Sequence, residues 1–119
     1  MTSRIETGSQ IFERYLARHA AADLEGVIAL FADDATVEDP VGSPIHDGID
    51  AIRGFYRETH ARNGVLDIER VGPILIGGAE LAAHVRARLA SPEAPPAMDV
   101  IYSLCFDEEG RIVALRAFF

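Results

Sequence analysis

The hydrophobic pattern of this 119-residue chain changes its period at about residue 65, and this change limits the possible folds more than any other feature. Before it, apolar residues recur at the three- and four-residue spacing of amphipathic helices. After it, apolar and polar residues alternate, as they do in strands with one buried face. Helices followed by hairpins predict an α+β domain with N-terminal helices packed on one face of an antiparallel β-sheet. We expect one domain over residues 1–119, because a chain of this length builds a single core.

Three helices are predicted in the first half of the chain. The first covers about residues 3–21, and its buried face carries Ile5, Phe12, Tyr15, Leu16 and His19. Asp23 can cap a short second helix, whose apolar residues are Leu24, Val27, Ile28 and Phe31. Asp47 can cap a third helix, whose buried side holds Ile49, Ile52, Phe55 and Tyr56.

The second half predicts a series of strands joined by turns. Residues 65–76 are rich in strand formers and are interrupted near Gly72-Pro73, and Gly77-Gly78 predicts a hairpin. The next strand has an inward row formed by Leu81, Ala83, Val85, Ala87 and Leu89. The strand after it has an apolar row formed by Met98, Val100, Tyr102, Leu104 and Phe106. The last strand, residues 111–119, is apolar on both faces, so we expect one face to contact a second copy of the chain in a homodimer.

Composition and charge disfavour several classes of function. The chain has 11 basic and 19 acidic residues and a net charge of −8, which disfavours nucleic acids and anionic membrane surfaces as partners. The single cysteine, Cys105, rules out an internal disulfide. The first residues lack the apolar core of a signal peptide, and no apolar run approaches the length of about 20 residues that a membrane span needs. We therefore expect a soluble cytoplasmic protein.

Metal binding is not expected, because four histidines are scattered without ligand spacing: His19, His46, His60 and His84.

Asp39 is the first candidate for chemistry. In the run that ends at Pro40, the residues Ala35, Val37 and Asp39 share one parity. Successive side chains of a strand point to opposite faces, so a strand that buries Ala35 and Val37 also turns Asp39 inward. A carboxylate on an apolar face is costly unless it is paired or has a function. Two readings stay open at this point: a general base, or a structural carboxylate paired with a backbone amide or an arginine.

Tyrosines share the inward positions with Asp39. Tyr102 lies in an apolar row, Tyr15 lies on the buried face of the first helix, and Tyr56 lies on the third. A few convergent polar groups in an apolar pocket are typical of a small-molecule site. A carboxylate that faces phenols suits proton transfer next to a carbonyl, because it can take a carbon-bound proton while the phenols donate to the oxygen that becomes negative. Each tyrosine can equally be a core residue whose hydroxyl is satisfied.

Three segments of the chain resemble bacterial ketosteroid isomerases. They are Phe31–Ser43, which contains Glu38-Asp39-Pro40-Val41-Gly42, then Ala51–Tyr56 and Phe106–Ile112. The resemblance implies the cone-shaped SnoaL-like fold shared with nuclear transport factor 2, with a curved sheet, a dimer and no cofactor. It identifies Asp39 with the general base and Tyr15 with the oxyanion-hole tyrosine of the family. It also matches Phe31 and Tyr56 to aromatic positions beside that tyrosine.

One position departs from the family pattern. The second oxyanion donor of the family is a protonated aspartic acid, and ungapped alignment through Met98–Phe106 places Tyr102 there. Asp99, the nearest carboxylate, has the opposite parity and would point away. A phenol stays protonated at neutral pH without any pKa shift, but it is longer and would fill part of a steroid site. A tyrosine at this position is compatible with the same proton-transfer chemistry, but it leaves the identity of the substrate open.

The resemblance implies a cofactor-independent steroid Δ5-3-ketone isomerase, which moves a double bond by proton transfer through a dienolate. The expected catalytic residues are Tyr15, Asp39 and Tyr102. The expected substrate contacts are Phe31, Phe55, Tyr56, Val85, Met98, Val100, Leu104, Phe118 and Phe119. The expected partner is a small, apolar, steroid-like ketone.

Two other classes of function stay open. The Glu-Asp-Pro-Val-Gly motif also resembles SnoaL-like enzymes of polyketide metabolism, and an epoxide-opening cyclase or hydrolase of that group would need a second acid in the pocket. Asp67 and Glu69 are the candidates, but Leu66 and Ile68 have the inward parity, which only a β-bulge would reverse. The third class is a non-catalytic binder of apolar ligands, because one fold hosts many functions.

Overall fold

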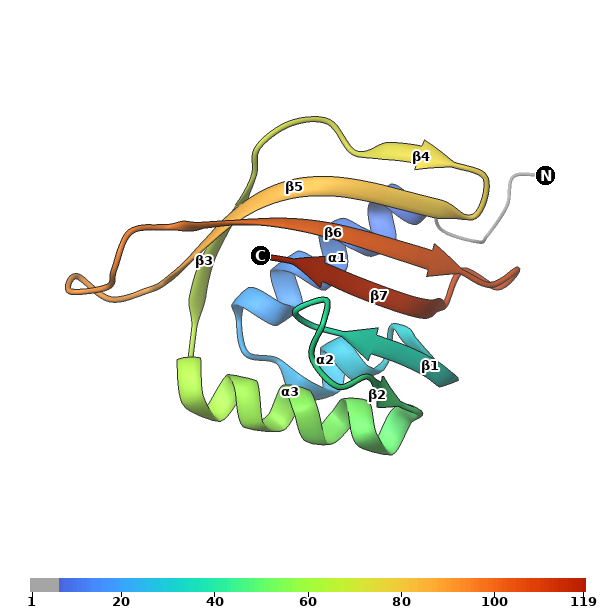
Figure 1. Ribbon diagram of the computed structural model, residues 1–119, viewed down its shortest axis with the longest axis horizontal. Coiled ribbons are helices and arrows are strands. Elements are labelled where there is room, and N and C mark those ends of the chain that lie inside the picture. Colours follow the sequence, from blue (N-terminus) through green and yellow to red (C-terminus); the bar gives the residue numbers. More distant parts are fainter. Residues whose placement is uncertain (1–6) are drawn as a thin grey trace.

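Residues 7–119 are described by the computed structural model, and they form three helices on one face of a curved sheet. The helices are α1 (Gly8–Ala20), α2 (Leu24–Ile28) and α3 (Ile49–Asn63). The strands are β1 (Phe31–Glu38), β2 (His46–Asp47), β3 (Leu66–Arg70), β4 (Leu75–Gly77), β5 (Glu80–Leu89), β6 (Met98–Phe106) and β7 (Ile112–Phe118). In Figure 1 the long strands β5 and β6 curve over α1, and α3 lies along the opposite side of the molecule. The predicted α+β class is confirmed.

The sheet is mixed, because one strand pair is parallel. Its order is β2-β1-β7-β6-β5-β3, and β4 also pairs with β5. Antiparallel pairing joins β5 to β6 and β6 to β7, as the hairpin pattern predicts. The exception is β1, which runs parallel to β7 with Val37 opposite Leu115. A tight turn forces antiparallel pairing only on the strands that it joins, and β1 and β7 are distant in the chain. The expectation of an antiparallel sheet therefore fails at this pair alone among the described strands.

The first helix begins at Gly8, because Thr7 and Gln10 form a capping box. The Gln10 N–H donates to Thr7 Oγ1 at 3.3 Å, and the Thr7 N–H donates to Gln10 Oε1 at 3.0 Å. The predicted start at residue 3, together with Ile5, lies outside the described residues. Within α1 the predicted face is buried at Phe12, Tyr15, Leu16 and His19.

The predicted N-terminal cap is confirmed for α2 and is wrong for α3. Asp23 caps α2 as predicted, and its Oδ1 accepts a backbone N–H of the first turn at 3.0 Å. Asp47 does not cap α3, because it lies opposite Thr36 in the β1–β2 pair. Gly48 takes the capping position, with a φ of 90° that favours glycine. Phe31 is also not helical, since α2 ends before it and β1 begins there.

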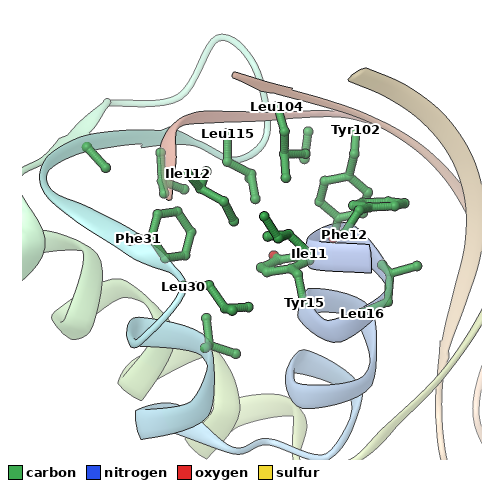
Figure 2. Packing of buried hydrophobic residues seen from close by; sticks show 14 of the residues in the cluster. Ile11, Phe12, Tyr15, Leu16, Leu30, Phe31, Tyr102, Leu104, Ile112 and Leu115 are labelled. Carbon is green, nitrogen blue, oxygen red and sulfur yellow. The ribbon is translucent and has the colours of Figure 1, made fainter. Parts of the chain in front are cut away.

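The core lies between the helices and the sheet. Figure 2 shows Phe12 and Tyr15 of α1 facing Tyr102 and Leu104 of β6. The rings of Phe12 and Tyr102 meet edge to face, with centroids 5.7 Å apart. The rows predicted on β5 and β6 are buried at Leu81, Ala83, Val85, Val100, Tyr102 and Leu104. At one end of these rows the cover is incomplete, so Ala87 and Leu89 are half-buried and Met98 is exposed.

An irregularity in the β6–β7 pairing changes which residues of β7 face the core. The register shifts between Cys105 and Phe106, and both Ile112 and Leu115 are fully buried although their parities differ. Beyond this point the inward parity runs through Leu115 toward Phe119. Phe118 has the outward parity and is 39% exposed. The end of β7 therefore presents one aromatic ring to each face of the sheet.

Candidate active site

A cavity of about 590 Å³ lies between α1, α3 and the incompletely covered end of β5 and β6. Its volume is within the range of small-molecule sites, which is roughly 300–1,000 Å³. His19 and Tyr102 are buried polar residues of its lining, and Asp39 also lines the cavity. An apolar wall is formed by Phe55, Met98, Val100 and Phe119. The mouth of the cavity is marked by exposed lining residues, among them Arg62, Arg88, Pro95 and Pro96, and Met98 and Phe119 of the apolar wall are exposed as well.

Asp39 directly follows β1 and lines this cavity, as its parity predicts. Val37 is fully buried, and Glu38 points to the other side. There Glu38 accepts hydrogen bonds from the Gly42 N–H and from Arg116 Nε, each at 3.0 Å. The carboxylate of Asp39 has no hydrogen bond or ion pair with any residue from 7 to 119. The structural reading, in which an amide or an arginine pairs with this carboxylate, has no support in that range.

Burial raises the pKa of Asp39 to about 6, from an ordinary value of 3.8. The cause is desolvation, because the surrounding residues exclude water from the carboxylate and the described chain offers it no cation in exchange. At neutral pH the group is still mostly ionised, and it is a stronger base than an exposed aspartate. These are the properties required to take a proton from carbon near pH 7.

Three tyrosines from three elements meet beside Asp39. Tyr15 and Tyr56 are fully buried, and their hydroxyl oxygens are 2.8 Å apart. The ring of Tyr102 lies across that of Tyr15, with centroids 5.6 Å apart and an interplanar angle of 73° (Figure 2). Tyr102 lines the cavity, whereas Tyr15 and Tyr56 lie behind its wall. The cluster therefore offers the cavity one phenol directly and two through hydroxyl contacts.

The phenols remain protonated across the physiological pH range. Burial raises the pKa of Tyr15 and Tyr56 well above their ordinary value, and the negative charge of Asp39 adds to this effect. Burial and the charge of Asp39 also raise the pKa of Tyr102, while its contact with the Tyr15 hydroxyl acts in the opposite direction. Protonated phenols near a carboxylate can donate hydrogen bonds to an oxygen that acquires negative charge.

A histidine pair that the sequence analysis did not assign to the site lies next to the tyrosines. His19 Nδ1 and His60 Nε2 are 3.1 Å apart, and His19 lines the cavity. Burial and the neighbouring His60 lower the pKa of His19 to about 4, so its ring is neutral. The signal was present in the spacing, because Tyr15 and His19 are four residues apart on one helix and Tyr56 and His60 are four apart on another.

The SnoaL-like domain family matches residues 12–115 of the chain. The chain belongs to this family. It is 32% identical over 109 residues to the steroid Delta-isomerase of Nocardioides simplex, a match that covers 88% of this chain and 83% of that protein. The resemblance noted from the sequence is thus confirmed.

A solved structure with the same fold is that of SalBIII, an epoxide hydrolase/cyclase-like enzyme with a role in pyran ring formation in the polyether salinomycin. It superposes with a TM-score of 0.79 at 23% identity, covering 93% of this chain and 88% of that one. At this identity the match shows a shared SnoaL-like fold and nothing about substrate.

The residues expected to contact substrate fall into three groups in this SnoaL-like domain. Those that line the cavity are Phe55, Met98, Val100 and Phe119. Those that lie in the core behind it are Phe31, Tyr56, Val85 and Leu104. Phe118 belongs to neither group, because its ring lies on the outer face of the sheet, 5.2 Å from the guanidinium of Arg116. The register shift in β7 accounts for this outward position.

The remaining carboxylates near the strands lie outside the cavity. Asp99 points outward, as expected, and its Oδ1 contacts His84 Nε2 at 2.7 Å and Arg86 Nε at 3.1 Å. Asp67 and Glu69 are exposed on β3, in agreement with the parity argument. Residues 7–119 contain no group of three or more His, Cys, Asp and Glu side chains that could hold a metal ion. No helix within that range is long and apolar enough to cross a membrane.

Proposed function

We propose that this SnoaL-like protein is a cofactor-independent isomerase of steroid Δ5-3-ketones. The observation that carries the proposal is the shared cavity of Asp39, an unpaired carboxylate with a raised pKa, and Tyr102, a protonated phenol. The similarity to a steroid Delta-isomerase over most of both chains supports the same class of reaction. The expected substrate is a small apolar ketone.

In the proposed reaction, Asp39 acts as a shuttle for one proton. Its carboxylate removes the proton at C4, between the ketone and the double bond of the substrate. The electron pair of that C–H bond forms a dienolate, whose negative charge develops on the C3 oxygen. The carboxylic acid of Asp39 then returns the same proton to C6, and the carbonyl re-forms in conjugation with the shifted double bond. Protons and electrons balance within the substrate, so the step requires no cofactor.

The proposed oxyanion donors are phenols. Tyr102 lines the cavity, and the hydroxyls of Tyr15 and Tyr56 lie behind it, 2.8 Å from one another. A hydroxyl that accepts a hydrogen bond becomes a stronger donor, so a chain of phenols supports the one at its end. We therefore give the direct contact with the substrate oxygen to Tyr102 and a supporting role to Tyr15. This reverses the order of importance that the family resemblance suggests.

The apolar wall supports a substrate with a hydrophobic ring skeleton. Phe55 and Phe119 contribute aromatic rings, and Met98 and Val100 contribute flexible and branched aliphatic groups. Each Å² of apolar surface removed from water contributes about 25 cal/mol to binding before the costs of association. Such a wall binds the skeleton without fixing its orientation, so polar groups must set the position of the ketone.

A second candidate function is epoxide opening, as in a SnoaL-like cyclase or hydrolase. The phenol cluster favours it, because Tyr102 could donate to an epoxide oxygen while Asp39 deprotonates an attacking hydroxyl. The second carboxylic acid that such chemistry normally uses is missing from the described lining of the cavity, where Asp39 is the one carboxylate. This difference places epoxide opening behind isomerisation.

An isomerase assay tests the proposal. The purified protein is mixed with 5-androstene-3,17-dione, and the absorbance of the conjugated enone product is followed. We expect turnover above the rate in buffer, loss of turnover in Asp39→Asn, and full turnover in Asp50→Asn, a matched change at an exposed position of α3. No turnover by the folded wild-type protein would contradict the isomerase function. Binding of the ketone without turnover would identify a non-catalytic binder.

We also infer that two copies of the chain pair through the outer face of the sheet. Ile101 and Phe118 lie opposite one another on β6 and β7 and are 49% and 39% exposed. Adjacent exposed apolar side chains of this size are typical of interfaces. Light scattering at micromolar concentration is expected to give twice the chain mass of 12.9 kDa. A monomer under these conditions would contradict the inference.

A further inference from the structure

The His19–His60 pair takes no part in the proposed proton transfer, although His19 lines the cavity. His19 is only 6% exposed, its Nδ1 is 3.1 Å from His60 Nε2, and its ring stacks on Tyr15 with centroids 5.5 Å apart. The second ring nitrogen, Nε2, has no hydrogen-bond partner among residues 7–119. Nε2 is not among the fully buried unpartnered atoms of the described chain, so it is accessible from the cavity that His19 lines and is available to a ligand there.

The surroundings of His60 indicate which nitrogen of His19 carries the proton. His60 Nδ1 is buried and has no hydrogen-bond partner in the described part of the chain. A buried N–H without an acceptor is rarer than a buried lone pair without a donor, which favours the proton of His60 on Nε2. The His60 Nε2–H then donates to His19 Nδ1, so the proton of His19 lies on Nε2. His19 thus presents an N–H donor to the cavity.

His19 and the two proposed catalytic groups line the same cavity from different elements. His19 lies on α1, Asp39 directly follows β1, and Tyr102 lies on β6. The cavity, at about 590 Å³, is large enough for a ligand of several rings. A ligand whose ketone meets Asp39 and Tyr102 can therefore present a second oxygen to His19.

We propose that His19 is a specificity residue, which donates a hydrogen bond from Nε2 to a second oxygen of the substrate. The substrate class is an apolar ketone with a further carbonyl, hydroxyl or ether oxygen in addition to the reacting ketone. His60 is a positioning residue, because its hydrogen bond sets the tautomer and the orientation of the His19 ring. The inference rests on the proposed function for the position of the ketone alone.

Two substitutions at His19 separate its two nitrogens. In His19→Asn the short amide reaches the position of Nδ1, so the contact with His60 is kept and the donor to the cavity is lost. In His19→Gln the longer amide reaches the position of Nε2, so the cavity donor is kept and the contact with His60 is lost. Both side chains are neutral, as His19 is. His84→Asn, on the outer face of the sheet, is the control for changing a histidine elsewhere.

Calorimetric binding of two conjugated ketones provides the measurement, and it requires no turnover. 4-Androstene-3,17-dione carries a second oxygen, and 4-androsten-3-one does not. We expect the wild-type protein, His84→Asn and His19→Gln to bind the dione about 5- to 10-fold more tightly than the monoketone, the effect of one hydrogen bond. We expect His19→Asn to bind both equally, with its affinity for the monoketone close to that of the wild-type protein.

The outcomes distinguish this proposal from the proposed function. A dione preference that disappears in His19→Asn supports the role of His19 even if the protein fails to isomerise 5-androstene-3,17-dione. Isomerisation with no dione preference, or with a preference that His19→Asn retains, overturns the role of His19 and leaves the isomerase intact. Failure to bind either ketone overturns it as well.

Nitrogen-15 NMR of the imidazoles adds a readout independent of ligands. Burial lowers the pKa of His60, and the charge of Asp23 opposes this effect only in part, so a neutral ring whose tautomer can be measured is expected. We expect the proton of His19 on Nε2 and a change in its shift when the dione is added. A proton on Nδ1 of His19 would overturn the donor role.

Discussion

Two side-chain pairs connect α1 to α3 one helical turn apart, and they differ in their relation to the cavity. Tyr15 meets Tyr56 and His19 meets His60, and each pair joins residues 41 positions apart in the chain. Both contacts are short, at 2.8 Å and 3.1 Å. The tyrosine pair is fully buried behind the cavity wall, whereas His19 forms part of that wall. The same spacing on the same two helices thus produces one internal contact and one that a ligand can reach.

Burial keeps both pairs neutral, and the position of each pair relative to the cavity determines whether a ligand can contact it. Burial raises the pKa of Tyr15 and Tyr56 and lowers that of His19, so all three are neutral at pH 7. The same effect on Asp39 is too small to neutralise it at that pH. The carboxylate of Asp39 is therefore ionised at pH 7 while the buried tyrosines and His19 around it are neutral, which allows it to act as a base.

The largest expected effect is the loss of this carboxylate. Asp39→Asn keeps the shape of the side chain but removes the proton acceptor, so kcat should fall by at least about 10²–10⁴-fold. In the wild-type protein, kcat/KM should be constant above pH 7 and should fall about tenfold per pH unit below the pKa of about 6, because protonated Asp39 is inactive. A profile that is flat from pH 5 to 8 would mean that a different group is the base.

The next largest effect separates the members of the tyrosine cluster. Tyr102→Phe should lower kcat by about 10- to 10³-fold, because it removes the donor that lines the cavity. Tyr15→Phe should cost less, and Tyr56→Phe least, since their hydroxyls act through the chain of phenols. Steady-state kinetics on the three variants checks the order. A larger loss in Tyr15→Phe than in Tyr102→Phe would restore the family's order of donors.

A smaller effect concerns stability, where removing the charge of Asp39 should help. The folded-state pKa of about 6 is above the ordinary value of 3.8, so the contribution of Asp39 to stability is present below pH 3.8 and is lost as the pH rises through 6. The shift corresponds to about 3 kcal/mol. Between pH 4 and pH 8, Asp39→Asn should therefore gain about that much in unfolding free energy relative to the wild-type protein. Urea unfolding of both proteins at pH 4 and pH 8 measures this gain. If the unfolding free energies of the wild-type protein and Asp39→Asn change equally with pH, the charge of Asp39 is not buried.

The last prediction applies the same test to the histidine pair, with the opposite sign. The pKa of His19 is lowered from 6.5 to about 4, so its contribution to stability is present above pH 6.5 and is lost as the pH falls through 4. The wild-type protein should lose about 3 kcal/mol over this interval that His19→Gln does not lose. Urea unfolding at pH 7 and pH 4 measures the difference. Equal losses would mean that His19 accepts a proton as readily when folded as when unfolded.

Local patterns in the sequence predicted the parts of the fold that depend on neighbouring residues. The alternation around Asp39 correctly turned it toward the cavity, and the parity of β6 correctly buried Tyr102 and turned Asp99 outward. Helix faces and the cap at Asp23 were also correct, because periodicity and capping act within a few residues. The roles of Asp39 and Tyr102 in catalysis stay predictions.

The features that the sequence did not predict depend on contacts between distant segments. Asp47 has the composition of a helix cap, but pairing with β1 takes it into a strand. Phe118 faces outward because the β6–β7 register shifts, which no alternation pattern reveals. The histidine pair also arises from two helices, so His19 and His60 looked unrelated when each was read alone.

The parallel pairing of β1 with β7 also sets the order in which the site can be assembled. Glu38, the neighbour of the base, is bound by Arg116 from a position 78 residues away. Closing a loop of this length costs entropy before any contact repays it, whereas helices and the β5–β6 hairpin form from nearby residues. We expect partly folded chains to contain these local elements while the segment around Asp39 is still free. Catalytic competence would then appear in the last kinetic step of folding, after most of the secondary structure is present.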